Sequence, residues 1–455
     1  MIAQRPASGG PKPRFFYGWI ILASTFTTLF MATGMQYSFG VFFKPILNEF
    51  GWDRASLSLA ASINAMVYGS LQPLIGKIID ERGPRPVMIT CGIVMSAGIA
   101  AISLTSDLWV IYVAYGVVAA SGVAGLTVVS TSALVVRWFV KRRGMALSVA
   151  GAGFAAGQLF IIPVAAYVIM LFGWRNAAVI LGGFLGIVVL PLAIWVMKSD
   201  PEKMGWLPDG ERLDSSAGSS AARGKSITAY SSAHGVATRA GARTPAGNAD
   251  NAPPVPIRRL VRTRTFWLLC GGFYVCGFTA SLVLTHLPAS VTDRGMSEMV
   301  AANAIGIIGL AATVSALAVG TLSDFTGRKN PLAGIYGLRG LALLLLISVV
   351  SDVPSLYLFA LLFGMSRAAT IPLTSGLIGD IYGRRSIGIT YGLILFAHQV
   401  GAAMGSYMAG AFYDATGSYF WAFFTASMLG FFAAVCSYLI KEERKVREPS
   451  LAPSR

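Results

Sequence analysis

The sequence predicts an all-α integral membrane protein with twelve transmembrane helices in two similar six-helix halves. Three observations lead to this fold class. Of the 455 residues, 55% are hydrophobic and only 12% are charged, whereas a soluble domain carries about 25% charged residues. Apolar runs of about 20 residues, the length that spans a bilayer, follow one another along the chain. A short charged motif recurs roughly half a chain later, as in a duplicated bundle.

Twelve apolar runs, separated by polar segments, are expected to cross the membrane. Glycine and proline are frequent within them, which helices packed in lipid tolerate. In order, the predicted spans are 17–43, 56–77, 86–104, 108–135, 144–171, 174–197, 265–290, 298–320, 331–350, 354–379, 387–412 and 417–440.

The spans divide the chain into two bundles joined by a linker. We expect an N-terminal bundle at 17–197 and a C-terminal bundle at 265–440, flanked by tails at 1–16 and 441–455. The segment between them, 198–264, is rich in Ser, Ala and Gly. Such a composition cannot bury enough apolar surface to fold alone, so it predicts a flexible linker.

The distribution of cations predicts the orientation. Lys and Arg are concentrated in the tails, the linker and every second loop, whereas the remaining loops carry only Lys44, Arg54, Arg175 and Arg294. The positive-inside rule then places both termini in the cytoplasm, and we expect a cell membrane, the inner membrane of a bacterium. This arrangement explains the net charge of +16 without a nucleic-acid partner. The four cysteines lie in apolar runs and show neither metal-ligand nor disulfide spacing.

A charged motif stands between the second and third spans of each half. "GKIIDERGPR" at 76–85 is matched by "GTLSDFTGRK" at 320–329, an offset of 244 residues. We expect each copy to form a loop whose Asp bonds an Arg or a helix N-terminus and so holds the halves in one conformation. An ordinary solvated loop is the alternative. The residues of this predicted latch are Gly76, Asp80, Arg82, Gly83 and Arg85, with Gly320, Asp324, Gly327, Arg328 and Lys329.

The repeated motif, G-x-x-x-D-x-x-G-x-[RK], resembles that of the major facilitator superfamily. The strings "FFKPI" (42–46), "RWFVKRRGMALSVAGAG" (137–153) and "FGWRNAAVILGG" (172–183) are similar to its monocarboxylate-transporter-like branch, which includes bacterial organic-acid carriers. The resemblance implies the major facilitator fold. It also implies alternating access around a central site lined by the first, fourth, seventh and tenth helices. We expect no cofactor. Because the repeat places two halves within one chain, we expect a monomer to suffice for transport, and oligomers stay open.

Arg367, in "FGMSRAATIP", is the foremost candidate for substrate contact. It lies about 20 Å into the tenth span at the helical rise. An arginine stays charged there, so it has to face water, an acidic partner or an anionic ligand. The alternative is a structural bond to backbone carbonyls or to Asp380.

His398, in the eleventh span, is the candidate for proton coupling because imidazoles titrate near physiological pH. A satisfied packing histidine is the alternative. His286 could guard the entrance, although placement at the membrane interface is favoured. Snorkelling or anchoring of the inner loop is favoured for Arg339. Further polar candidates for ligand contact, which could equally hold helices together, are Gln36, Tyr37, Tyr115, Thr127, Tyr274 and Gln399.

The chain departs from the family at the expected anion clamp. Relatives that carry carboxylates usually have an Arg in span eight, one turn before the second motif glycine, where Ala316 stands here. Ala312 and Tyr37 occupy the places of an Asp and a Lys in animal relatives. The positive charge would then come from Arg367 and His398, or else the substrate is less acidic.

These observations favour a secondary active transporter for a small organic anion, a carboxylate. Proton coupling, uniport and exchange all stay open because acidic residues are almost absent from the spans. An exporter of neutral or amphipathic compounds is the second hypothesis, and a non-transporting receptor or scaffold is the third. No phosphate loop, HExxH or GxSxG motif is present, so we do not expect an enzyme.

Overall fold

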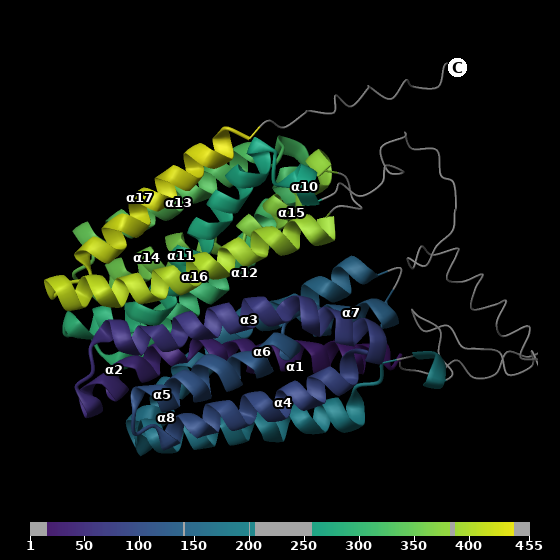
Figure 1. Ribbon diagram of the computed structural model, residues 1–455, viewed down its shortest axis with the longest axis horizontal. Helices are drawn as coiled ribbons and strands as arrows, with labels where there is room; N and C mark the ends of the chain where they lie inside the picture. Colours follow the sequence, from purple (N-terminus) through teal and green to yellow (C-terminus); the bar gives the residue numbers. More distant parts are fainter. Residues whose placement is uncertain (1–15, 140–141, 200, 205–256, 383–386, 441–455) are drawn as a thin grey trace, which may run out of the picture.

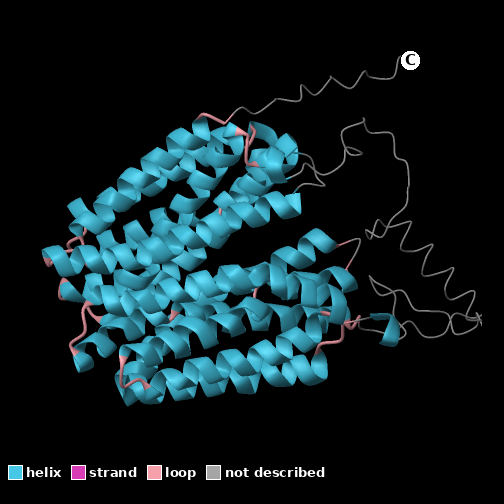
Figure 2. Ribbon diagram, viewed as in Figure 1, coloured by secondary structure: helices cyan, strands magenta, loops and turns pink. Residues whose placement is uncertain are grey.

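The computed structural model describes residues 16–139, 142–199, 201–204, 257–382 and 387–440. Within these ranges the chain is helical, without strands, and short loops connect the helices (Figure 2). Two bundles lie against each other, with α3 (Arg54–Arg82) and α16 (Ile387–Thr416) side by side between them (Figure 1). The predicted linker falls mainly on 205–256, outside the described residues.

The first bundle contains the predicted spans one to six. Its fourth crossing is built from several pieces, including a π-helical stretch at Tyr112–Ala119. The fifth and sixth crossings form one long helix that bends at Gly173. The helices are α1 (Gly18–Tyr37), α2 (Phe39–Phe50), α3, α4 (Pro84–Ala101), α5 (Leu108–Ile111), α6 (Ala120–Leu126), α7 (Val128–Trp138) and α8 (Arg143–Pro191), followed by a π-helical turn at Leu192–Val196.

The second bundle has the same order of crossings. A short helix, α10 (Ile257–Leu260), precedes it. Its fourth crossing is also broken, between α14 and α15. The helices are α11 (Arg264–Asp293), α12 (Glu298–Thr326), α13 (Lys329–Ser348), α14 (Val353–Arg367), α15 (Thr370–Tyr382), α16 and α17 (Phe420–Tyr438).

Helix lengths agree with twelve crossings. Nine helical stretches of the described chain are long and apolar enough to span a bilayer. One of them, Met145–Val196, has 52 residues and turns at Gly173, where φ is 75°, so it provides two crossings. The more polar α3 and α16, with 29 and 30 residues, are also long enough to cross at the helical rise.

Six glycines with positive φ show that the two bundles share one backbone plan. They form three pairs, each separated by 244 residues: Gly51 with Gly295, Gly83 with Gly327, and Gly173 with Gly417. Each glycine ends a helix or turns the chain where a Cβ would be strained. At the same offset, α3 and α12 have identical lengths, and Asp53 and Ser297 each accept a hydrogen bond from the backbone at the helix start.

The repeated charged motif is more helical than predicted. Its first part belongs to the last turns of α3, which ends at Arg82, and of α12, which ends at Thr326. Gly76, Asp80, Gly320 and Asp324 are therefore helical residues, and only the second glycine of each copy makes the turn. The loop prediction was wrong for Asp80 and Asp324, which lie beyond the predicted spans 56–77 and 298–320, because a helix does not stop where its apolar run stops. The charged turns continue it beyond the predicted span.

Candidate substrate site between the two halves

The break in the tenth crossing places Arg367 between the halves. It is the last residue of α14, and α15 resumes at Thr370. The Arg367 side chain is 9% exposed, and its Nη1 donates to Oε1 of Gln158, on α8 of the other half, at 2.9 Å. Its guanidinium carbon lies 5.4 Å from the ring centre of Tyr37 and 5.8 Å from that of Phe154.

This environment supplies donors but no counter-charge. Within the described part of the chain, no carboxylate forms an ion pair with Arg367, and Asp380 pairs with Arg328 instead. The expected alternative bond from Arg367 to Asp380 is therefore absent. Gln158 is fully buried, and its Nε2 has no hydrogen-bond partner among the described residues. A buried guanidinium beside a spare amide donor suits an acceptor-rich, negatively charged ligand.

Two of the predicted polar residues, Gln36 and Tyr115, form a network with Asn64 within the N-terminal half. The Tyr115 hydroxyl donates to the Gln36 carbonyl at 3.0 Å, and the Gln36 amide reaches Asn64 at 3.4 Å. Asn64 in turn donates to the Tyr115 carbonyl at 2.8 Å, and the Tyr115 ring stacks on Phe39. These bonds join the first, second and fourth crossings. They therefore agree with the alternative that these polar residues hold helices together rather than contact a ligand.

Gln399 and His398 lie at the contact between α16 and α3. Gln399 Nε2 donates to the Ala65 carbonyl at 3.2 Å, across the two halves, and its Oε1 lies 2.7 Å from His398 Nδ1. His398 is partly exposed and packs on Phe273. In the described chain, no bond or ring contact joins either residue to Arg367.

Thr127 and Tyr274, the other two candidates, likewise have no described bond or ring contact to Arg367. Thr127 separates α6 from α7, and its hydroxyl lies 3.5 Å from that of Tyr68. Tyr274 contacts the ring of Phe278 on its own helix. Tyr37 is thus the one sequence-predicted polar partner that the described structure brings to the Arg367 guanidinium.

Arg339 differs most from its prediction. Its side chain is fully buried and donates to the Ser366 carbonyl and, at 3.3 Å, to the Arg367 carbonyl. Snorkelling and loop anchoring are therefore wrong. The unwound end of α14 offers a buried arginine carbonyl acceptors, which the periodicity of the sequence does not reveal.

A charged cluster that sequence analysis did not predict joins the halves at the end of the molecule where α3 begins, opposite the end of α3 that carries the charged motif. We term this end the far end. Asp293 of α11 pairs with Lys44 at 2.8 Å and with Arg54 at 2.7 Å. Asp414 accepts from the backbone amides of Arg54 and Ala55 at 2.9 and 2.6 Å, at the positive end of α3. Two ion pairs and a helix cap therefore bridge the bundles.

His286 extends this cluster inward. Its Nε2 lies 2.8 Å from the Ser406 carbonyl, and its Nδ1 lies 3.1 Å from the Tyr419 hydroxyl. Arg54 donates to that hydroxyl at 2.6 Å, which leaves the Tyr419 O–H free to donate to Nδ1 while Nε2–H donates to the Ser406 carbonyl. The favoured placement of His286 at the membrane interface is wrong, since it is fully buried beside Ser58 of the other half.

Two of the predicted latch residues, Arg85 and Arg328, have described bonds within their own half. Arg85 donates to the carbonyls of Ala193 and Ile194, and Arg328 pairs with Asp380. Arg82 is exposed, and Lys329 lies over the Tyr438 ring. The side chains of Asp80 and Asp324 lie outside the described part, so the latch stays a prediction.

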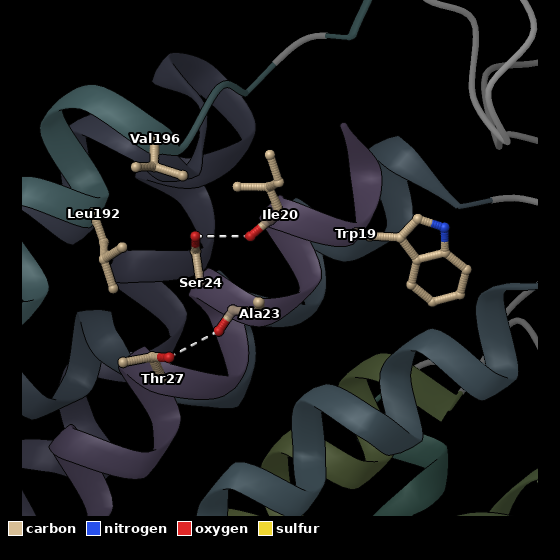
Figure 3. A pocket seen from close by; sticks show the side chains of 7 residues that line it. All are labelled: Trp19, Ile20, Ala23, Ser24, Thr27, Leu192 and Val196. Carbon is tan, nitrogen blue, oxygen red and sulfur yellow. Dashed lines mark hydrogen bonds between the residues drawn. The ribbon is translucent and has the colours of Figure 1, made fainter. Parts of the chain in front are cut away.

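A groove of about 320 Å³ opens between α1 and the end of the sixth crossing. Its hydroxyls are already used, because Ser24 and Thr27 donate to carbonyls of their own helix (Figure 3). Apart from the Trp19 indole, the other side chains of the wall are apolar, so this groove does not suit a polar substrate. The lining residues are Trp19, Ile20, Ala23, Ser24, Thr27, Leu192 and Val196.

Comparison with known proteins agrees with this architecture. The family model of the Major Facilitator Superfamily matches residues 25–349 and 291–454. A solved bacterial homolog of the human lysosomal transporter Spinster has a similar fold, with a TM-score of 0.69, 15% sequence identity, and coverage of 94% of this chain and 97% of that one.

Sequence relatives cover nearly the full chain. An uncharacterized MFS-type transporter, YcxA of Bacillus subtilis (strain 168), is 27% identical over 420 residues, which are 88% of this chain and 90% of that protein. Monocarboxylate transporter 13 of Rattus norvegicus is 25% identical over 427 residues, 91% of this chain and 85% of the relative. The relatives are transporters, which confirms that the chain is not an enzyme. This multi-pass membrane protein belongs to the Major Facilitator Superfamily.

Proposed function

We propose that this transporter carries a small organic anion, a carboxylate, and that Arg367 binds it between the two halves. The observation that carries the proposal is the buried guanidinium of Arg367, which has a neutral amide and two aromatic rings around it and no described ion-pair partner. A charge buried in this way is costly unless a ligand compensates it. The relatives named monocarboxylate transporters support the same substrate class.

We propose that transport proceeds by alternating access and that the described conformation is closed at the far end. Lys44, Arg54 and Asp293 bridge the halves there. The backbones also approach closely, since a Cβ at Gly40 would lie 2.4 Å from the Leu284 carbonyl oxygen. Both termini would face the cytoplasm, because the positive-inside rule assigns the cation-rich loops to that side.

The test is uptake of labelled acetate, lactate, pyruvate, succinate and benzoate into proteoliposomes, with and without an inward proton gradient. Arg367→Gln should lower uptake of the transported acid by at least about ten-fold, as expected when a buried charge-assisted hydrogen bond is lost. Arg294→Gln is the matched control, because Arg294 caps a helix end at the far end and should leave uptake unchanged.

The same experiment separates the alternatives. Accumulation only under the gradient supports proton coupling, whereas gradient-independent exchange supports an antiporter or uniporter. Full activity of Arg367→Gln contradicts the proposed site. Absence of uptake for every acid redirects the search to neutral or amphipathic compounds, and absence of transport of those compounds as well favours the receptor or scaffold hypothesis.

A further inference from the structure

The broken tenth crossing leaves backbone groups that neighbouring helices have to satisfy. The last carbonyls of α14 have no intrahelical partner and carry the negative end of the helix dipole. In the bilayer core, water does not compensate them. Ser315 of α12 donates to the Met365 carbonyl at 2.5 Å, and the Thr370 hydroxyl donates to the Arg367 carbonyl at 3.0 Å. The Ser366 carbonyl has neither of these donors.

Arg339 of α13 donates to the Ser366 carbonyl and is a second donor to the Arg367 carbonyl. Its Nη2 donates to both of them, and its Nε lies 3.4 Å from the Ser366 hydroxyl. On the opposite side, Nη1 donates to the hydroxyl of Thr279 on α11 at 3.3 Å. All three nitrogens are therefore bonded, and the Tyr336 ring lies 5.3 Å from the guanidinium carbon.

The charge of Arg339 is met by a helix end rather than by an acid. Its side chain is 0% exposed, and within the described chain no carboxylate pairs with it. A buried cation normally requires an anionic partner. The negative end of α14 takes that place, so Arg339 and the break in α14 depend on each other.

The N-terminal half shows that such a break does not itself require a cation. Its fourth crossing is interrupted at Thr127, between α6 and α7. The position equivalent to Arg339, 244 residues earlier, is the buried Met95. The arginine is thus specific to the half whose break carries Arg367.

We propose that Arg339 is a positioning residue for substrate binding, which fixes the Arg367 backbone so that its guanidinium reaches the anion site. This inference rests on the proposed function. One residue links the two roles: the Arg367 carbonyl accepts from Arg339, while the Arg367 side chain points across to Gln158. If the bond from Arg339 to the Arg367 carbonyl is weakened, the Arg367 side chain is displaced from Gln158.

The test uses Arg339→Lys, which keeps the charge but cannot present a planar fork to two carbonyls. Arg294→Lys is the matched control, because Arg294 Nη1 also donates to two helix-end carbonyls, those of Leu346 and Val350, but at the far end. The probes are the labelled acids named above, and KM and maximal rate are measured together with thermal unfolding. Thr279→Val is a milder variant that removes one partner of Arg339.

We expect Arg339→Lys to raise KM by about ten-fold or more, since small misplacement of a binding group is costly, with a smaller change in maximal rate. Thr279→Val should raise KM by about three-fold by the same reasoning, and Arg294→Lys should not change it. A purely structural role would lower the unfolding temperature and leave the KM of the folded protein unchanged, which overturns the inference.

The two proposals fail in different ways. If Arg367→Gln transports like wild type, the anion site itself is wrong. If Arg367→Gln loses uptake while Arg339→Lys and Thr279→Val keep the wild-type KM, only the positioning role is wrong. If Arg339→Lys does not fold, Thr279→Val decides.

Discussion

At the scale of single residues, the buried arginines differ in what satisfies their N–H groups. Arg339 bonds through all three nitrogens to protein acceptors, and Arg54 contacts Asp293 and Tyr419. Arg367 has one described hydrogen bond, to the neutral amide of Gln158. A ligand gains most binding free energy from hydrogen bonds to buried donors that have no partner in the protein. This property distinguishes Arg367 from the structural arginines.

Gln158→Glu tests whether the Arg367 guanidinium has to be free for substrate. A carboxylate placed there would form an internal ion pair and compete with the transported anion, so uptake should fall by about ten-fold or more. Gln158→Met is the neutral control with a smaller expected effect. Initial uptake rates in proteoliposomes measure both, and wild-type transport by Gln158→Glu would contradict an anion site at Arg367.

His398→Gln tests proton coupling. Glutamine can hydrogen-bond to Gln399 as the imidazole does, but it cannot take up a proton, so gradient-driven uptake should be lost while exchange between equal pools continues. Uptake at several external pH values measures the gradient-driven transport, and counterflow measures the exchange. An unchanged pH dependence would remove His398 from coupling.

At the scale of the elements, glycines set how closely helices approach. A Cβ on Gly277 of α11 would lie 1.9 Å from the His398 carbonyl oxygen, and one on Gly401 of α16 would lie 2.0 Å from that of Tyr274. These two helices can therefore be in contact only because neither position carries a side chain. Composition alone shows that glycine is abundant, but not which glycines face a neighbour.

Gly277→Ala should destabilise the protein by about 1–3 kcal/mol, because the added methyl group overlaps a backbone atom. Gly271→Ala on the same helix is the matched control, since its Cβ would meet nothing within 4 Å, and it should be neutral or slightly stabilising. Thermal unfolding in detergent compares them. Equal stability of the two variants would show that the close contact of α11 and α16 is not required.

At the scale of the whole molecule, local properties were predictable and contacts between the halves were not. Hydropathy located the spans, and the motif revealed the repeat, because both are read within one segment. Gln158 and Phe154 were not predicted as site residues, because they contact Arg367 from the other half and that contact depends on how the two bundles pack together. One signal for the far-end contacts was available in the sequence, because the cation-poor loops contain only four cations. In the structure all four are bonded: Lys44 and Arg54 pair with Asp293, Arg175 pairs with Glu49, and Arg294 donates to backbone carbonyls.

Asp293→Asn should weaken closure at the far end, because one substitution removes the ion pairs to both Lys44 and Arg54. Spin labels on the exposed residues Asn48 and Ser418, one in each half, should then show a larger population of long distances. Glu49→Gln is the matched control, since its pair with Arg175 lies within one half. An unchanged distance distribution in Asp293→Asn would mean that these ion pairs do not hold the far end closed.

The three glycine pairs make each residue of one bundle comparable with a counterpart in the other, because no net insertion separates the copies between them. Arg367 then corresponds to Val123, Arg339 to Met95, His398 to Phe154, Gln158 to Ala402 and Gln399 to Ala155. Each of these five polar residues thus stands against an apolar twin. The two halves share a symmetric backbone frame, whereas these polar groups stand on only one side of each pair. Replacing each polar residue by its apolar twin, one pair at a time, would then show which of these side chains transport requires and which the packing requires.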